Sequence, residues 1–148
     1  MGLFAAPPRP RLGDPRRFSR VMVAGPRATS VGLSSPLVVG ACHFEPGRVV
    51  LPPQPYAQPW LRAVLEVTDP DATAHLDVYD VAGVSTGGTP GVVANSELQI
   101  ASVIPQLGET ALWSLWGTYG VFQTRLWVTG PEGAQAICSF ASLDFDWS

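Results

Sequence analysis

The stretch that most constrains the fold is residues 61–79, LRAVLEVTDPDATAHLDVY, which alternates apolar and polar side chains on both sides of a polar turn. Alternation with a period of two is typical of a β-strand with one buried face. The central Asp-Pro-Asp has turn chemistry, because proline presets φ and aspartate side chains bond nearby backbone N–H groups. The stretch therefore predicts a β-hairpin whose apolar face is covered by a second sheet. The expected core side chains are Leu65, Val67, Leu76 and Val78, and the expected surface side chains are His75, Asp77 and Tyr79.

The rest of the chain continues the β pattern. Its 148 residues include 15 prolines and 15 glycines, which divide it into short segments and leave little room for long helices. Residues 18–33 fit either two short strands or an extended strap. Further strands are predicted at residues 37–44, 98–104, 110–116, 122–129 and 134–147, with 110–116 paired to 122–129. Seven or eight antiparallel strands indicate an all-β protein with a single β-sandwich, for which a jelly roll is the preferred topology.

Positive charge is concentrated near the N-terminus. Residues 1–30 carry six arginines and one aspartate, whereas the remainder carries three arginines and eleven acids. We therefore predict an extended, Pro/Arg-rich attachment arm over residues 1–35 and a sandwich domain over residues 36–148. Its expected partner is an acidic protein surface, including that of a neighbouring copy. Nucleic acid is not expected, because the arm lacks interleaved aromatics and lysines. The predicted partner-binding residues are Arg9, Arg11, Arg16, Arg17 and Arg20.

The chain offers little for catalysis or metal binding. His43 lies in an apolar segment and is expected in the core, and no serine is placed beside His75 by any nucleophile motif. The acids of the central turn are explained by the turn itself, and Asp144 and Asp146 by the solvent face of a strand. The spacing of a calcium-binding loop is absent. We predict no enzymatic activity, no metal and no cofactor.

Three other features receive structural interpretations. Cys42 and Cys138 each lie in an apolar run, which favours buried free thiols, although a disulfide stays open. Residues 85–91, STGGTPG, lack the Lys-Ser/Thr sequel of a phosphate-binding loop and are interpreted as a flexible loop. No apolar run approaches the ~20 residues that span a bilayer, so we expect a soluble protein without membrane contact.

The five tryptophans are the most suggestive residues. Trp113 and Trp116 would point to opposite faces of a strand, as would Leu126 and Trp127, so one of each pair leaves the core. Exposed aromatic rings fill subunit interfaces or stack on sugars. We favour the interface, with a carbohydrate-binding module that uses exposed tryptophan and loop 82–96 as the alternative. The candidate residues are Trp116, Trp127 and Trp147.

Four segments within residues 61–147 carry a resemblance: LRAVLEV, ATAHLDVYDV, ELQIASVIP and TRLWVTGPEGAQAICSFASLDF. Together they resemble the small β-sandwich modules of tailed-bacteriophage virions, which occur as fibres, head decorations and tail accessories. The resemblance implies a non-enzymatic virion component, made in the host cytoplasm and attached to other virion proteins by its N-terminal segment. It also implies a homo-oligomer, with a trimer favoured, and leaves a host-surface glycan open as a further partner.

Overall fold

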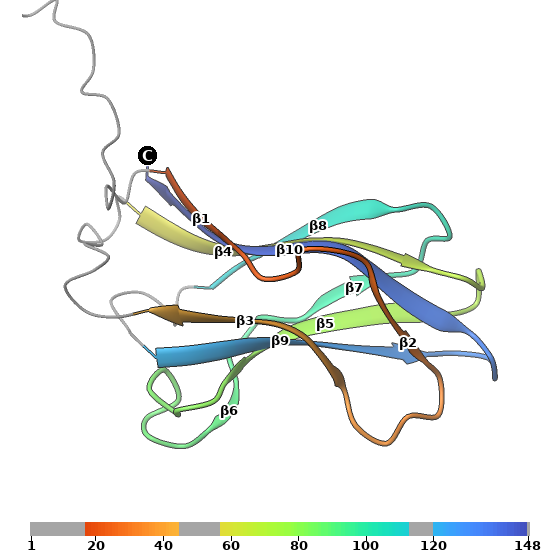
Figure 1. The fold of residues 1–148 in the computed structure, drawn as a ribbon, viewed down its shortest axis with the longest axis horizontal. Coiled ribbons are helices and arrows are strands. Elements are labelled where there is room, and N and C mark those ends of the chain that lie inside the picture. The colour runs from red at the N-terminus through yellow and green to blue at the C-terminus, as the bar shows by residue number, and fades with distance from the viewer. Residues whose placement is uncertain (1–16, 45–56, 113–119, 148) are drawn as a thin grey trace, which may run out of the picture.

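The computed structural model describes residues 17–44, 57–112 and 120–147. These residues form ten β-strands in two five-stranded sheets, with no helix in the described ranges. The strands are β1 (Arg17–Val21), β2 (Arg27–Ser30), β3 (Leu37–Phe44), β4 (Ala57–Val67), β5 (Thr73–Asp80), β6 (Gly91–Val92), β7 (Leu98–Ile100), β8 (Gln106–Ala111), β9 (Gly120–Thr129) and β10 (Gln135–Trp147). The sheets lie face to face as two layers (Figure 1).

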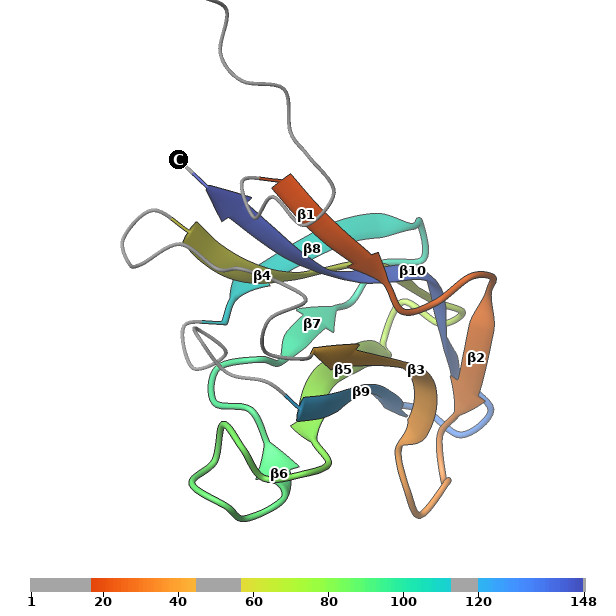
Figure 2. The ribbon, with the colours of Figure 1, turned by 60° about the vertical axis from the view of Figure 1, so that its left-hand side comes forward.

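The strand order is that of a jelly roll. Sheet A has the order β1-β10-β4-β8, and β2 pairs with a further part of β10 on the same side as β1. Sheet B has the order β3-β9-β5-β6, and β7 pairs with a further part of β5 on the same side as β6. Because β1 and β2 share one position, and β6 and β7 share another, the ten strands fill eight positions, all paired antiparallel. Two interlocked Greek keys give this order. The predicted all-β sandwich and its jelly-roll topology are confirmed, and Figure 2 shows the two layers from a second direction.

The central stretch is not a hairpin, which corrects the first expectation. β4 pairs with β10 and β8 in sheet A, whereas β5 pairs with β9, β6 and β7 in sheet B. The Asp69 carbonyl accepts a bond from Ala72 N at 3.0 Å and its carboxylate one from Asp71 N at 2.8 Å, so the predicted turn is present. It carries the chain between layers, and the two apolar faces therefore meet each other. The predicted core residues Leu65, Val67, Leu76 and Val78 are all at most 1% exposed.

One other predicted pairing was wrong, and one predicted strand is shorter than expected. The strand expected at 110–116 begins earlier, as β8, and pairs with β4, while β9 lies between β3 and β5 in the other sheet. The strand expected at 98–104 is shortened to β7, after which Ser102 O accepts a bond from Val67 N at 2.8 Å. Alternation specifies which face of a strand is buried, but it does not specify the partner strand.

The N-terminal strands belong to the sandwich. β1 pairs with β10 from Arg17↔Asp146 to Val21↔Ser142, and β2 continues along the same strand to Gln135. Two short strands, the first of the alternatives for residues 18–33, are therefore confirmed. The segment 17–30 lies within the range assigned to the arm, and residues 1–16 of that range lie outside the described residues.

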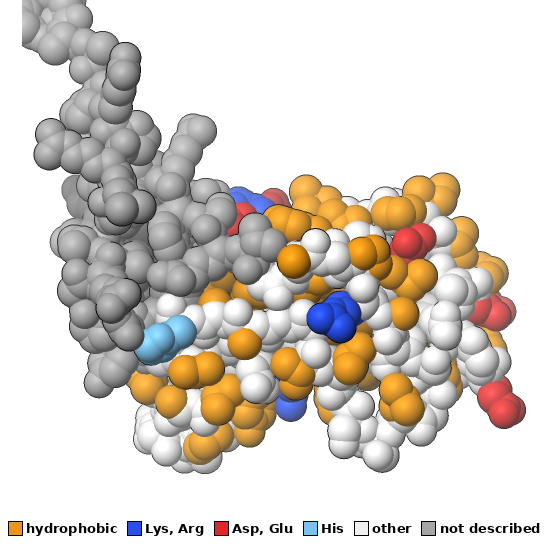
Figure 3. Space-filling model, viewed as in Figure 1, with side chains coloured by type: hydrophobic (Ala, Val, Ile, Leu, Met, Phe, Trp, Pro, Cys, Tyr) orange, Lys and Arg blue, Asp and Glu red, His pale blue; other side chains and the backbone are white. Residues whose placement is uncertain are grey.

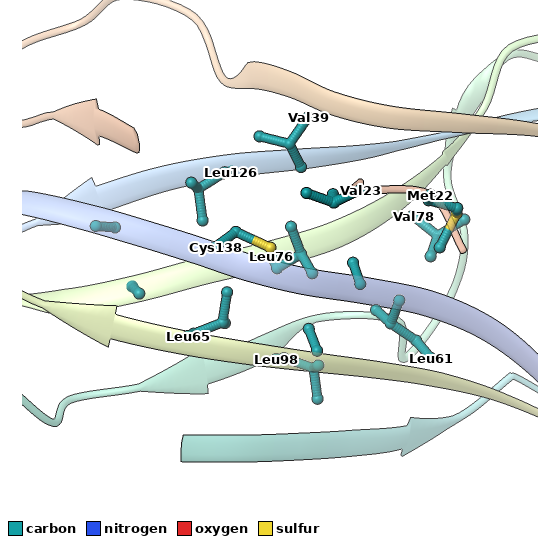
Figure 4. Close-up of a cluster of buried hydrophobic side chains, with 14 of the residues drawn as sticks. Met22, Val23, Val39, Leu61, Leu65, Leu76, Val78, Leu98, Leu126 and Cys138 are labelled. Carbon is teal, nitrogen blue, oxygen red and sulfur yellow. The ribbon is translucent and has the colours of Figure 1, made fainter. Parts of the chain in front are cut away.

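The core is closed at one side by the connection between β1 and β2. Met22 and Val23 are 6% and 3% exposed and lie among the side chains of both sheets (Figure 4). β3 passes so close that a Cβ on Gly40 would lie 1.9 Å from the Met22 carbonyl oxygen, so only glycine fits there. The register of β3 shifts beside this contact, between Val38 and Gly40. Cys42 and Cys138 are both buried and form no disulfide, as favoured.

Candidate interaction surfaces

Of the eight residues predicted as interaction sites, four lie in the described ranges. Arg9, Arg11, Arg16 and Trp116 lie outside the described ranges. The backbone of Arg17 and Arg20 lies in β1 and that of Trp147 in β10, but their side chains are not described. The one predicted site residue with a described side chain is Trp127, on the outer face of sheet B.

Trp127 stacks on a histidine of the neighbouring strand. His75 and Trp127 are direct partners in the β5–β9 register, and their ring centroids lie 5.1 Å apart with an angle of 4° between the planes. Stacked rings on adjacent strands stabilise each other beyond the area that they bury. One face of the tryptophan ring is therefore occupied within the chain.

His75 is held at both ring nitrogens. Nδ1 lies 2.7 Å from Glu97 Oε1, and Nε2 lies 2.9 Å from Thr129 Oγ1. The order carboxylate, imidazole, hydroxyl is the order of a catalytic triad. Here it lies on a sheet face, where Thr129 belongs to the β5–β9 ladder. The two bonds hold the imidazole in a fixed orientation.

The next pair along the same face is an ion pair. Arg125 Nε and Nη2 donate to the two carboxylate oxygens of Asp77 at 3.0 and 2.9 Å, and the guanidinium lies 4.4 Å from the Tyr79 ring centroid. The hydrogen bonds that Arg125 donates to the Asp77 carboxylate raise the pKa of Arg125, so the guanidinium stays charged. Asp77 is only 2% exposed, which corrects its interpretation as an ordinary surface residue.

His43 also differs from its prediction. Cys42 is 8% exposed, whereas the next residue, His43, lies exposed on the outer face opposite Val121. The register shift earlier in β3 resets the alternation, so that the cysteine and not the histidine enters the core. The hydrophobicity of the segment did not reveal this shift.

The outer face of sheet A has a different character. Leu107 lies opposite Val64, which lies opposite Phe140, so an apolar row crosses three strands. Leu107 is 64% exposed, and the connection before β8 adds Val103 and Ile104, which are 50% and 67% exposed. Figure 3 shows hydrophobic side chains along the edge of the molecule where β8 lies. Apolar side chains grouped in this way mark contact surfaces.

Charged side chains border this apolar row. Arg62 Nε donates to Glu109 at 3.0 Å, and Arg62 Nη1 donates to Asp144 at 2.9 Å. The same guanidinium lies 5.3 Å from the Trp60 ring centroid. Asp144, expected on a solvent face, is on the outer face but only 7% exposed, because it is paired with Arg62. Both carboxylates of the border are thus paired with the single guanidinium of Arg62 within the chain.

The first turn of the glycine-rich loop after β5 is held by hydrogen bonds to Asp80. The Asp80 carboxylate accepts bonds from Gly83 N at 2.8 Å, from Ser85 N at 2.6 Å and from Ser85 Oγ at 2.9 Å. Burial opposes the charge of Asp80, but these hydrogen bonds outweigh it and lower the pKa of the carboxyl. Gly83 has a φ of 74°, and a Cβ there would lie 2.6 Å from the Thr89 backbone. The loop that was interpreted as flexible is therefore anchored at its first turn.

The described residues contain no group of three or more His, Cys, Asp or Glu side chains that could hold a metal ion. Within the same ranges, no helix is long and apolar enough to cross a membrane.

The chain is a jelly-roll β-sandwich, and a solved structure of a viral particle contains a similar fold. The VP2 subviral particle of infectious bursal disease virus matches with a TM-score of 0.52 and 11% identity, over 88% of this chain and 31% of that chain. T=1 particles derived from the same virus give a TM-score of 0.47 and 7% identity, over 88% and 35% of the two chains. This chain thus spans about a third of the structures that it matches, and at these identities the likeness concerns the fold. The sequence matches no protein-family model, and the search of curated proteins found no match.

Proposed function

We propose that this chain is a non-enzymatic structural component of a virus particle. The observation that carries the proposal is the jelly-roll strand order, with its likeness to the VP2 subviral particle over 88% of the chain. The likeness covers 88% of this chain, so it takes in most of the sandwich. The resemblance of residues 61–147 to phage modules supports the finer proposal, a decoration, fibre or tail accessory of a tailed bacteriophage.

In this proposal the chain assembles with copies of itself, with a trimer as the favoured form. The apolar row of Leu107, Val64 and Phe140 supplies the contact, together with the exposed Ile104. A second copy is the expected occupant, because the row is aliphatic and aromatic and the two carboxylates beside it are already paired with Arg62 within each chain, so the contact needs no partner of opposite charge. Burial of this aliphatic surface is the driving force of assembly.

The N-terminal segment attaches the sandwich to other virion proteins. Residues 1–16 carry Arg9, Arg11 and Arg16 against one aspartate, while the chain as a whole has a net charge of −3. A positive segment on a negative body suits an acidic acceptor surface on a neighbouring protein. The arginines favour bidentate contacts with carboxylates there.

Co-sedimentation with purified particles tests this proposal. The full chain, carrying a C-terminal tag, is expected to sediment with particles through a density gradient. A variant without residues 2–16 keeps every described strand, so it is expected to fold, with unchanged near-ultraviolet circular dichroism, but to remain in the soluble fraction. A full chain that never co-sediments contradicts the virion assignment. Full co-sedimentation of the truncated chain contradicts only the attachment role of the arm.

A further inference from the structure

A hollow of about 540 Å³ lies at the side of the sandwich, between the connection from β6 to β7 and strand β8. Its polar lining is Asn95, Ser96, Glu97 and Thr110, and its apolar lining is the short run 92–94. The volume is within the range of small-molecule sites, roughly 300–1,000 Å³. Neither the strand order nor the proposed assembly surface uses it.

The walls of the hollow are fixed by hydrogen bonds. Val93 N donates to Val78 O at 2.8 Å, and the Ser96 hydroxyl contacts the backbone N and O of the same Val78 at 3.2 and 3.4 Å. Across the hollow, Thr110 Oγ1 donates to Asn95 O at 2.9 Å. Asn95 is the one non-glycine residue of the described ranges with a positive φ, 55°. A wall that is ordered before binding loses little conformational entropy when a ligand arrives.

The wall presents a carboxylate and a neutral amide to a ligand in the hollow. Glu97 is oriented by His75, which bonds its Oε1 at 2.7 Å, and Gln99 Nε2 donates to the same oxygen at 3.0 Å. No hydrogen bond to the second oxygen, Oε2, or to the Asn95 side-chain amide occurs among the described residues, and both residues are exposed. The hollow thus offers a carboxylate acceptor beside an amide that both donates and accepts.

The lining defines the chemistry of the ligand. Among the described residues no arginine, lysine or histidine lines the hollow, so a phosphate, sulfate or carboxylate would meet Glu97 without a counter-charge from them. A neutral polyhydroxylated ligand fits better, because its hydroxyls donate to Glu97 and both donate to and accept from Asn95. The small exposed apolar side chains of Val92 and Ala94 suit the C–H face of a sugar ring, while Val93 points into the core.

We propose that this hollow binds a neutral sugar residue, with Asn95 and Glu97 as the contact groups and Thr110 as a further acceptor. The assignment moves the sugar contact away from Trp127, which does not line the hollow and whose ring already stacks on His75. His75 acts as a positioning residue, since it holds Glu97 in place. The inference does not depend on the proposed virion role.

Saturation-transfer NMR on the full chain, with glucose, galactose, mannose and N-acetylglucosamine as probes, tests the proposal. We expect saturation transfer from the protein to at least one of these neutral sugars. Asn95→Gly removes the amide while tolerating the positive φ, and E97Q keeps an oxygen acceptor for His75; each is expected to weaken binding about tenfold. E132Q, a change in the exposed turn between β9 and β10, is the matched control and should bind as the unchanged chain does.

The result that overturns the proposal is the absence of neutral-sugar binding at millimolar concentration, or binding that survives both N95G and E97Q. Selective binding of sialylated or sulfated sugars would also overturn it. Intrinsic tryptophan fluorescence verifies that each variant is folded. Particle co-sedimentation of E97Q should be unchanged, so a failure of sugar binding is distinguishable from a failure of the virion role.

Discussion

The outer faces of the two sheets differ in how far their side chains satisfy one another. On sheet B the polar and aromatic groups pair within the chain, as His75 does with Trp127 and Arg125 with Asp77. On sheet A the aliphatic row ends in Leu107, which is 64% exposed, next to Ile104 at 67%. A face rich in aromatic and charged residues can thus be complete in itself, whereas a plain aliphatic face gains free energy from a partner.

The largest effect that would test this comparison is expected at Arg125. R125M leaves the carboxylate of Asp77, 3% exposed at its side chain, without its partner. Loss of one member of a buried pair typically costs 3–5 kcal/mol, and we expect about 3 kcal/mol because the arginine is itself partly exposed. Urea unfolding measures the change in the free energy of unfolding.

A double variant and a control sharpen that test. D77N together with R125M removes both charges and should recover part of the loss, as coupled neighbours do. E109Q, on the exposed pair with Arg62 in sheet A, should change the free energy of unfolding by less than about 1 kcal/mol. Equal losses in R125M and E109Q would contradict the contrast between the faces.

A second, smaller effect concerns the core that both faces share. Burial raises the pKa of the Cys138 thiol to about 11, from an ordinary value of 9.0. As the pH rises above 9, the unfolded chain loses this proton first, so stability falls between about pH 9 and 11. The two pKa values correspond to a loss of about 2–3 kcal/mol. In C138A that component of the pH dependence should vanish, whereas C42A should retain it; a slope unchanged in C138A would contradict the shift.

The burial pattern was largely predictable from the sequence, but strand partners were not. Alternation placed Leu65 and Leu76 in the core correctly, because a pleated strand has only two faces. It could not show that β4 and β5 join different sheets, since a turn at Asp69 is compatible with either arrangement. The partner depends on pairings with β10 and β9, which are distant in the sequence.

The same limit applies to the candidate surfaces. The alternation in FQTRLWVT predicted that Trp127 leaves the core, yet its stack on His75 depends on the β5–β9 register. Asp77 was assigned to open surface because its partner, Arg125, lies on that other strand. The opposite charges of two outward residues were the available signal, but without a register they could not be matched. The hollow at Asn95 left no sequence signal beyond its polar loop composition.

A third effect, smaller again, is expected at His75. H75A removes the ring stack with Trp127 and the bonds to Glu97 and Thr129, for which we expect a loss of about 1 kcal/mol. The emission of Trp127 should change, which a fluorescence spectrum measures. Hydrolysis of p-nitrophenyl acetate by the unchanged chain should not exceed that by T129V. Faster hydrolysis that T129V abolishes would mean that this face is a catalytic site and not only a self-satisfied surface.

The smallest effect on folding is expected on sheet A, where Leu107 and Ile104 contact mainly solvent. L107E and I104E should each alter the free energy of unfolding by no more than about 0.5 kcal/mol, as exposed substitutions usually do. Their effect should instead fall on assembly, because a carboxylate buried against a second copy is costly to desolvate. Light scattering coupled to size-exclusion chromatography should show an oligomer for the full chain and a monomer for L107E. V121E, on an exposed valine of sheet B, should leave the oligomer intact. If V121E dissociates the oligomer and L107E does not, copies associate through sheet B, and the contrast between the two faces would have to be reversed.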